Sequence, residues 1–96
     1  MDAVLEAINN HKYLEFQYEG YPRKVIPFAY GGHASTHNKV MRGLQVAGGS
    51  ASGKYDFPKL WTVDQMTSLK VLDETFEIPE RYQKGDENIS PIDAEL

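Results

Sequence analysis

Cysteine is absent from the sequence, which excludes a disulfide framework, a thiolate metal site and a cysteine nucleophile. No apolar run reaches the length of a membrane span, and the first residues lack the pattern of a secretory signal. Basic residues are in the minority, with 10 Lys and Arg against 14 Asp and Glu, so the formal net charge is −4. A protein that coats nucleic acid needs the opposite balance. These absences predict a cytoplasmic protein that binds through one local site.

The residues that are present fit one small globular domain. The chain has 96 residues, of which 41% are hydrophobic and 11% aromatic, enough for a small core without disulfides or metals. We expect residues 1–79 to form this domain. Residues 80–96 are expected to be an acidic tail that is either docked on the domain or partly disordered.

Charge is segregated along the chain. Residues 1–19 carry one Lys against four acids, and residues 20–63 carry six Lys and Arg against Asp56 alone. Residues 64–96 return to nine carboxylates against three cations. A basic middle between acidic ends predicts a local surface that faces an anion. Lysines that keep strand edges soluble would give the same pattern, so this alternative stays open.

Apolar periodicity predicts one short helix followed by five strands. The helix is expected from Asp2, with a stop at Asn9-Asn10. The sequence favours a bulge or sheet edge at Pro27 and the end of the second strand at Gly31-Gly32. Five short strands with one helix suit a strongly bent sheet that closes into a small barrel. The expected strands cover residues 13–19, 23–30, 40–47, 59–63 and 68–76.

The segment Gly48 to Lys54 has the spacing of a phosphate-binding loop, G-x-x-x-x-G-K. Tyr55 stands where Ser or Thr would hold magnesium, and no helix is expected to follow. We therefore interpret the segment as a flexible hairpin loop. Its backbone N–H groups and Lys54 could still close over an anion.

Catalytic and metal-binding patterns find little support. His33 and His37 are four residues apart, but they fall in an expected loop without a third ligand nearby, so no metal site is predicted. Ser50 and Ser52 have no recognisable base. The carboxylates fall mainly in the helix start and the tail, which is typical of a solvated surface. We therefore expect a protein that is not an enzyme; a small phosphate-ester hydrolase would need a base and usually a metal.

Arg42 is the most informative single residue. On a regular strand it shares one face with the core candidates Val40, Leu44 and Val46. A guanidinium on an apolar face must be paired, either with an internal carboxylate or with an anionic ligand. The burial argument alone slightly favours the internal ion pair.

Lys59 and Trp61 share a face of the expected fourth strand, which would combine phosphate attraction with a platform for stacking a base. The alternative is that Trp61 is a core residue and that the Lys59 side chain passes it on the way to solvent. Tyr30 is among the tyrosines that would add flat surface near such a site.

Four segments occur in an order that resembles the WYL-like domain of bacteria and their viruses. The resemblance spans residues 3–89 and includes Arg81-Tyr82 and Gly85-Asp86. Lys39-Val40-Met41 stands at the tripeptide that names the family. After the expected fourth strand, in Asp64-Gln65-Met66, Gln65 replaces a basic residue that the family often has before the hydrophobic residue. The segments are Arg23-x-Val25-x-Pro27, Met41-Arg42-Gly43-Leu44-Gln45-Val46, Lys59-Leu60-Trp61-Thr62-Val63-Asp64 and Phe76-x-x-Pro79.

The resemblance implies a small Sm-like barrel that acts as a sensing module. In that family a cluster of polar, basic and aromatic residues is thought to receive a nucleotide, an oligonucleotide or another anion. Carried over by position, Arg42, Lys59 and Trp61 belong to this cluster, so the resemblance favours ligand contact for Arg42. Family members commonly follow a DNA-binding helix-turn-helix, which we do not identify in these residues, so a stand-alone domain is expected.

The leading hypothesis is a non-enzymatic WYL-like module that senses or sequesters an anionic nucleotide-type ligand or a short single strand, with no cofactor. The alternative is a protein–protein interaction module that docks on a regulator or polymerase through its acidic tail. Exposed strand edges also make a homo-oligomer plausible. The candidate ligand-binding residues are Arg23, Tyr30, Arg42, Gln45, Ser50, Ser52, Lys54, Lys59 and Trp61.

Overall fold

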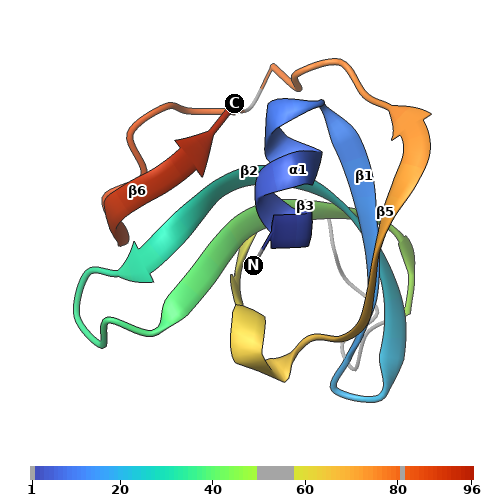
Figure 1. Cartoon of the computed structure of the whole chain (residues 1–96), viewed down its shortest axis with the longest axis horizontal. Coiled ribbons are helices and arrows are strands. Elements are labelled where there is room, and N and C mark those ends of the chain that lie inside the picture. The colour runs from blue at the N-terminus through green and yellow to red at the C-terminus, as the bar shows by residue number, and fades with distance from the viewer. Residues whose placement is uncertain (1, 50–57, 81) are drawn as a thin grey trace.

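A computed structural model describes residues 2–49, 58–80 and 82–96 as a mainly antiparallel β fold with one short helix (Figure 1). The elements are α1 (Asp2–Asn9), β1 (Lys12–Tyr18), β2 (Tyr21–His33), β3 (Lys39–Gly48), β4 (Lys59–Thr62), the 3-10 turn η1 (Val63–Gln65), β5 (Thr67–Thr75) and β6 (Ile89–Glu95). The predicted helix and all five predicted strands are confirmed, and β6 is an additional strand. None of the helices in the described ranges is long and apolar enough to cross a membrane.

The strands form one curled sheet in the order β4-β3-β2-β1-β5, and β6 pairs with β2 (Figure 1). Within the described residues β4 and β5 do not pair, so the predicted closed barrel is not observed. The reason lies in η1, which carries the chain from one edge strand of the sheet to the other without a ladder between them.

Helix α1 and the concave side of the sheet enclose the main core. Val4 and Ile8 of α1 are buried, and β1 alternates buried Leu14 and Phe16 with exposed Glu15, as its period of two predicts. Burying each such side chain contributes about 1.5–3 kcal/mol. We call the face of the sheet that meets α1 the inner face.

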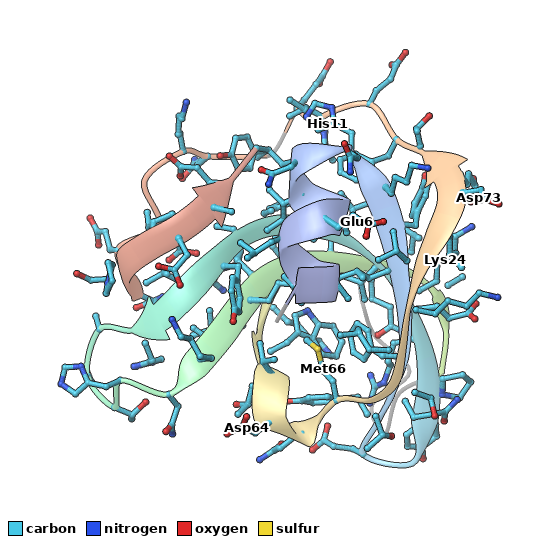
Figure 2. The ribbon with its side chains drawn as sticks, viewed as in Figure 1. Glu6, His11, Lys24, Asp64, Met66 and Asp73 are labelled. Carbon is cyan, nitrogen blue, oxygen red and sulfur yellow. The ribbon has the colours of Figure 1, made fainter. Side chains whose placement is uncertain are left out.

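Figure 2 shows how the η1 turn closes the lower end of this core. Met66 is 9% exposed and lies beneath α1, whereas Asp64 and Asp73 point away into solvent. The hydroxyl oxygen of Tyr18 accepts a hydrogen bond of 3.1 Å from the backbone N–H of Thr62. This contact ties the end of β4 to the end of β1, although the two strands do not pair.

Strand β2 is long enough to pair with two different strands along one edge. Residues 21–25 pair with β1, and residues 29–33 pair with β6. The register shifts between Pro27 and Ala29, which confirms the predicted irregularity at Pro27. The predicted strand end at Gly31-Gly32 is wrong, because both glycines pair with β3 and Gly31 also pairs with β6. A Cβ atom on Gly31 would collide with the carbonyl oxygen of Pro91, so this approach requires glycine.

Residues 82–96 pack on the sheet instead of trailing from it. The backbone N–H of Leu96 donates to the carbonyl oxygen of Phe28 at 2.9 Å. The Tyr82 hydroxyl donates to the Leu96 carbonyl at 2.7 Å, and the Tyr82 ring meets the Phe28 ring edge-on at 5.3 Å. The segment expected as a docked or partly disordered tail thus supplies a strand and part of a second apolar layer.

Strand β3 divides its side chains between this second layer and the main core. Met41 is buried in the inner-face core, whereas Val40 and Leu44 pack in clusters on the opposite side. We call that opposite side, which residues 76–96 partly cover, the outer face. Val46 is 39% exposed, so its predicted place in the core is wrong. Arg42 lies on the outer face, as its predicted alternation with Val40 and Leu44 requires.

Candidate functional site

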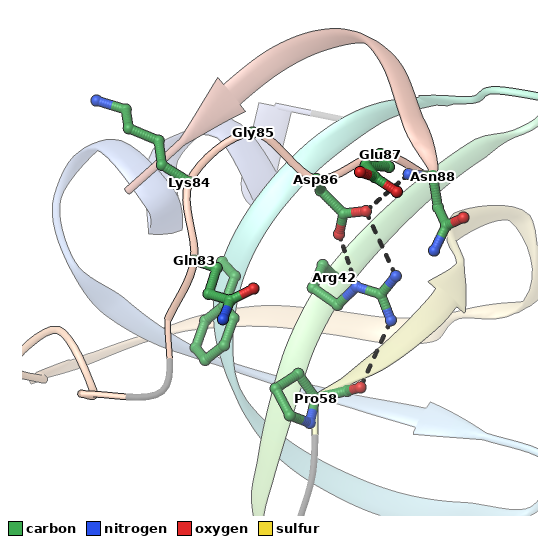
Figure 3. Close-up of a pocket in the computed structure, with 9 residues that line it drawn as sticks. Arg42, Pro58, Gln83, Lys84, Gly85, Asp86, Glu87 and Asn88 are labelled. Atoms are coloured by element: carbon green, nitrogen blue, oxygen red, sulfur yellow. Dashed lines mark hydrogen bonds and ion pairs between the residues drawn. The ribbon is translucent and has the colours of Figure 1, made fainter.

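A pocket of about 690 Å³ lies on the outer face, between β3 and the chain that leads into β6 (Figure 3). Arg42 projects into it from β3, and Phe28 of β2 contributes an apolar wall. The other walls come from Pro58 and from the polar stretch that precedes β6. The residues that line the pocket are Phe28, Arg42, Pro58, Gln83, Lys84, Gly85, Asp86, Glu87 and Asn88.

An ion pair between Arg42 and Asp86 is the strongest polar contact of the pocket. Arg42 Nε donates to Asp86 Oδ2 at 2.6 Å, and Arg42 Nη2 donates to Asp86 Oδ1 at 3.4 Å (Figure 3). Arg42 Nη1 reaches the carbonyl oxygen of Pro58 at 3.5 Å, a weak contact. The side chains of Arg42 and Asp86 are 22% and 11% exposed. The guanidinium is therefore paired but still accessible from the pocket.

The surroundings of Asp86 favour its ionised form. Partial burial alone would raise the pKa of the carboxyl group, but hydrogen bonds from Arg42 and from the backbone N–H of Asn88 oppose this. Together with the charge of Arg42 they lower the pKa below its ordinary value of 3.8. At neutral pH the pair is thus a full cation against a full anion.

The remaining charged groups of the pocket stand at its rim. Lys84 and Glu87 are both exposed, and Figure 3 shows the Lys84 side chain pointing away from Arg42. Glu87 follows Asp86 directly on the same wall. Among the described residues that line the pocket, Arg42 is therefore the cation that a bound anion would meet, and the carboxylate of Asp86 is its competitor.

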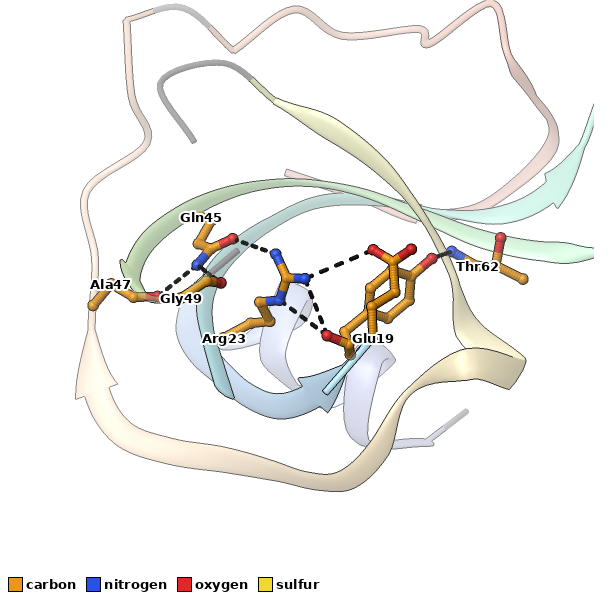
Figure 4. Close-up of polar contacts among 7 residues, drawn as sticks. Glu19, Arg23, Gln45, Ala47, Gly49 and Thr62 are labelled. Carbon is orange, nitrogen blue, oxygen red and sulfur yellow. Dashed lines mark hydrogen bonds and ion pairs between the residues drawn. The ribbon is translucent and has the colours of Figure 1, made fainter. Parts of the chain in front are cut away.

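Arg23 lies in the inner-face core instead. Its side chain is 2% exposed, and Nη1 donates to Gln45 Oε1 at 3.2 Å (Figure 4). Nε and Nη2 both donate to the carbonyl oxygen of Tyr18, at 3.3 and 3.0 Å. The nearest carboxylate contact is with Glu19, at 3.7 Å, on a side chain that is 67% exposed. These contacts make Arg23 a structural residue of the core.

Gln45 and Trp61 complete this buried polar group. Gln45 Nε2 donates to the carbonyl oxygens of Ala47 and Gly49, each at 3.0 Å. Trp61 is 2% exposed, and its Nε1–H donates to the carbonyl oxygen of Gly43 at 3.1 Å. A buried ring whose N–H is satisfied belongs to the core.

Aromatic rings and cations pack around Trp61. Its ring meets the Phe16 and Tyr18 rings edge-on at 5.4 and 5.0 Å, and the Arg23 guanidinium carbon lies 5.4 Å from its centroid. Lys59 Nζ lies 5.7 Å from the same centroid. The structure therefore has the second of the two arrangements considered for Lys59 and Trp61, a core tryptophan with a lysine passing it. A base could not stack on Trp61 without rearrangement of this core.

The candidate residues that the structure describes thus lie on two different faces of the sheet. The inner face brings Arg23, Gln45, Lys59 and Trp61 together, and the sheet separates them from Arg42 on the outer face. Tyr30 is 3% exposed and belongs to the inner-face core, with Lys39 Nζ 5.6 Å from its ring centroid. Ser50, Ser52 and Lys54 lie outside the described residues.

Asp86 and its neighbours were not among the predicted site residues. The signal that could have found them is Gly85-Asp86, a pair that belongs to the resemblance but to which no role was given. His33, considered as a metal ligand, stabilises a turn: its Nδ1 accepts hydrogen bonds from the backbone N–H groups of Ser35 and Thr36, at 3.0 and 3.3 Å.

Comparisons of the chain with models of known protein families, with curated proteins and with solved structures gave no match. The resemblance to WYL-like domains therefore stays a prediction from the sequence. The case for a site on this chain depends on the geometry described above.

Proposed function

We propose that this chain is a non-enzymatic binding domain of the WYL-like type, and that its outer-face pocket takes an anionic nucleotide-type ligand or part of a short single strand. The observation that carries the proposal is Arg42: a partly exposed guanidinium in the wall of a pocket of about 690 Å³, neutralised by one carboxylate of the same chain. Pockets for small ligands commonly have volumes of about 300–1,000 Å³.

Arg42 has the chemistry that such a ligand requires. A guanidinium presents N–H donors in a planar fork that matches two oxygens of a carboxylate or a phosphate. The contacts with Asp86 Oδ1 and Oδ2 already use this fork, so a phosphate can take the same position when Asp86 turns away. The neighbours of Asp86 on the chain, Gly85 and Glu87, are exposed, which leaves space for that turn.

The rest of the pocket suits the other parts of a nucleotide. The half-buried ring of Pro58 can contact a sugar or the face of a base, and the amide groups of Gln83 and Asn88 can donate and accept hydrogen bonds. Binding alone is the proposed action, so the chain would sense its ligand or hold it away from others.

Isothermal titration calorimetry with mononucleotides, cyclic nucleotides and short single strands tests this proposal. Arg42→Gln should abolish binding, because it removes the cation. Asp86→Asn should tighten binding by roughly tenfold, because it removes the competing anion and keeps the size and shape of the side chain. A merely structural ion pair would give no gain in Asp86→Asn.

Asp93→Asn is the matched control. It removes a carboxylate from another surface ion pair, that of Lys39 Nζ with Asp93 Oδ2 at 2.7 Å, and should leave affinity unchanged. Binding that survives Arg42→Gln would place the ligand elsewhere on the chain. If nothing in the panel binds, the proposal is wrong, and a protein–protein interaction module becomes the function to test.

A further inference from the structure

The charge balance of the pocket limits the negative charge that its ligand can carry. Among the described residues that line the pocket, one cation, Arg42, faces into it, and one carboxylate, Asp86, neutralises it at 2.6 Å. A ligand that carries one negative charge and takes the place of the Asp86 carboxylate leaves the net charge beside Arg42 unchanged. Each further negative charge would have no partner of its own among the described lining residues, because Lys84 points away from Arg42 (Figure 3).

Two carboxylates stand close to where an additional charge would lie. Asp86 remains on the same wall after it has turned away, and Glu87 follows it in the chain. Like charges a few ångströms apart repel by about 1 kcal/mol or more even in a medium close to water. A doubly charged group would therefore bind against repulsion from both carboxylates, whereas a singly charged group would exchange with one of them.

The two kinds of nucleotide phosphate differ in this property. A terminal phosphate monoester carries a charge of about −1.5 to −2 at pH 7, because its second pKa is about 6. A phosphodiester carries one negative charge and keeps two free oxygens, as a carboxylate does. The diester therefore matches Asp86 in both charge and hydrogen-bonding geometry.

We propose that the pocket selects phosphodiesters over terminal phosphates, so that its ligand is a cyclic nucleotide or the internucleotide phosphate of a strand. This inference rests on the proposed function and names the ligand class for the same site. Its physical basis is the exchange of one negative charge, that of Asp86, for one negative charge on the ligand beside Arg42.

A matched pair of probes isolates charge from shape. The 5′-monophosphates of adenosine, guanosine, cytidine and uridine are compared by calorimetry with the O-methyl phosphate ester of each, which differs by one methyl group and one ionisable oxygen. At about pH 7.5 the esters should bind roughly tenfold tighter than the monophosphates. At about pH 5, where the monophosphates are close to singly charged, the difference should nearly vanish.

The carboxylate of Asp86 keeps its charge over this range. The charged groups among the described lining residues of the pocket are Arg42, Lys84, Asp86 and Glu87, and no histidine is among these described residues. The pKa of Asp86 is below its ordinary value, so this carboxylate remains ionised at both pH values. A difference that closes at lower pH therefore reports the ligand's second proton.

Two variants test whether Glu87 is a source of the repulsion against a doubly charged phosphate. Glu87→Gln should reduce the preference for the ester at about pH 7.5, whereas Asp64→Asn, which removes an exposed carboxylate on η1, should leave it unchanged. Monophosphates that bind as tightly as their esters at that pH would overturn this inference and leave the proposed function in place. If none of these probes binds, the proposed function fails, and the inference falls with it.

Discussion

Arg42 and Asp86 are 44 residues apart in the sequence, and their side chains meet at 2.6 Å on the outer face of the sheet. The contact joins β3 to the stretch that leads into β6. It therefore fixes one wall of the pocket and also neutralises the cation that faces into the pocket. Under the proposed function, ligand binding and the stability of the C-terminal segment would be linked through this one pair.

The first prediction concerns the pH dependence of stability. The pKa of Asp86 is lowered in the folded chain from 3.8, so the unfolded chain binds a proton at this group more readily in acid. The stabilisation from ionised Asp86 is therefore fully present above pH 3.8, the ordinary pKa of the group. It is lost as the pH falls through the lower pKa that the group has in the folded chain. Asp86→Asn should be less stable than wild type at neutral pH, by about 1–3 kcal/mol.

Urea unfolding at about pH 7 and about pH 3 measures this effect. The gap between wild type and Asp86→Asn should narrow in acid, because protonation removes the same charge that the substitution removes. A gap that stays constant with pH would show that the carboxylate charge of Asp86 contributes nothing to folding.

The second prediction separates the buried polar group from the ligand site. Gln45→Leu removes the acceptor of Arg23 Nη1 and the donor to the carbonyl oxygens of Ala47 and Gly49. Leaving a buried charged donor unsatisfied costs about 1–3 kcal/mol or more, so unfolding should occur at clearly lower urea concentration.

Ligand affinity, measured by calorimetry on the folded Gln45→Leu protein, should be unchanged, because Gln45 and Arg42 lie on opposite faces of the sheet. A loss of affinity without a loss of stability would reverse these assignments and move the site to the inner face.

The alternation of side chains explains how much of the site the sequence could predict. The placement of Arg42 with Val40 and Leu44 followed from period two and is confirmed, and β1 alternates in the same way, with Leu14 and Phe16 buried. The same alternation puts residues 42 and 45 on opposite faces. Grouping Arg42 with Gln45 and Trp61 in one site therefore relied on the resemblance and went beyond the pattern.

Long-range pairing is what the sequence could not show. Gly31-Gly32 has the local signal of a strand end, and only its pairing with β3 and β6 makes it part of a strand. Strand β6 itself is short, acidic and interrupted by Pro91, so its propensity for a strand is weak. Asp86 meets Arg42 only because residues 82–96 pack on the sheet, so the sequence could not show this ion pair either.

A third prediction tests the contact between β2 and β6. Gly31→Ala places a methyl group against the carbonyl oxygen of Pro91 and within 2.7 Å of Ile89 Cγ2. Because a backbone atom cannot move aside locally, β6 should shift, at a cost of about 1–3 kcal/mol. Hydrogen exchange of the amides in residues 89–95 should become faster in this variant.

Gly32→Ala is the neighbouring control, since its methyl group would meet nothing nearer than the Ser90 carbonyl oxygen at 3.4 Å. It should leave stability and exchange close to those of wild type. Equal exchange rates in the two variants would contradict the close packing of β6 on β2.

The most direct test follows two N–H resonances by NMR during titration with a cyclic nucleotide. Arg42 Nε–H faces the pocket, whereas the indole N–H of Trp61, the one tryptophan of the chain, is bonded to the Gly43 carbonyl in the core. Binding in the outer-face pocket should shift the Arg42 resonance, assigned with Arg42→Gln, and leave that of Trp61 in place. A shift of the Trp61 resonance with Arg42 unmoved would contradict the account and put the ligand on the inner face.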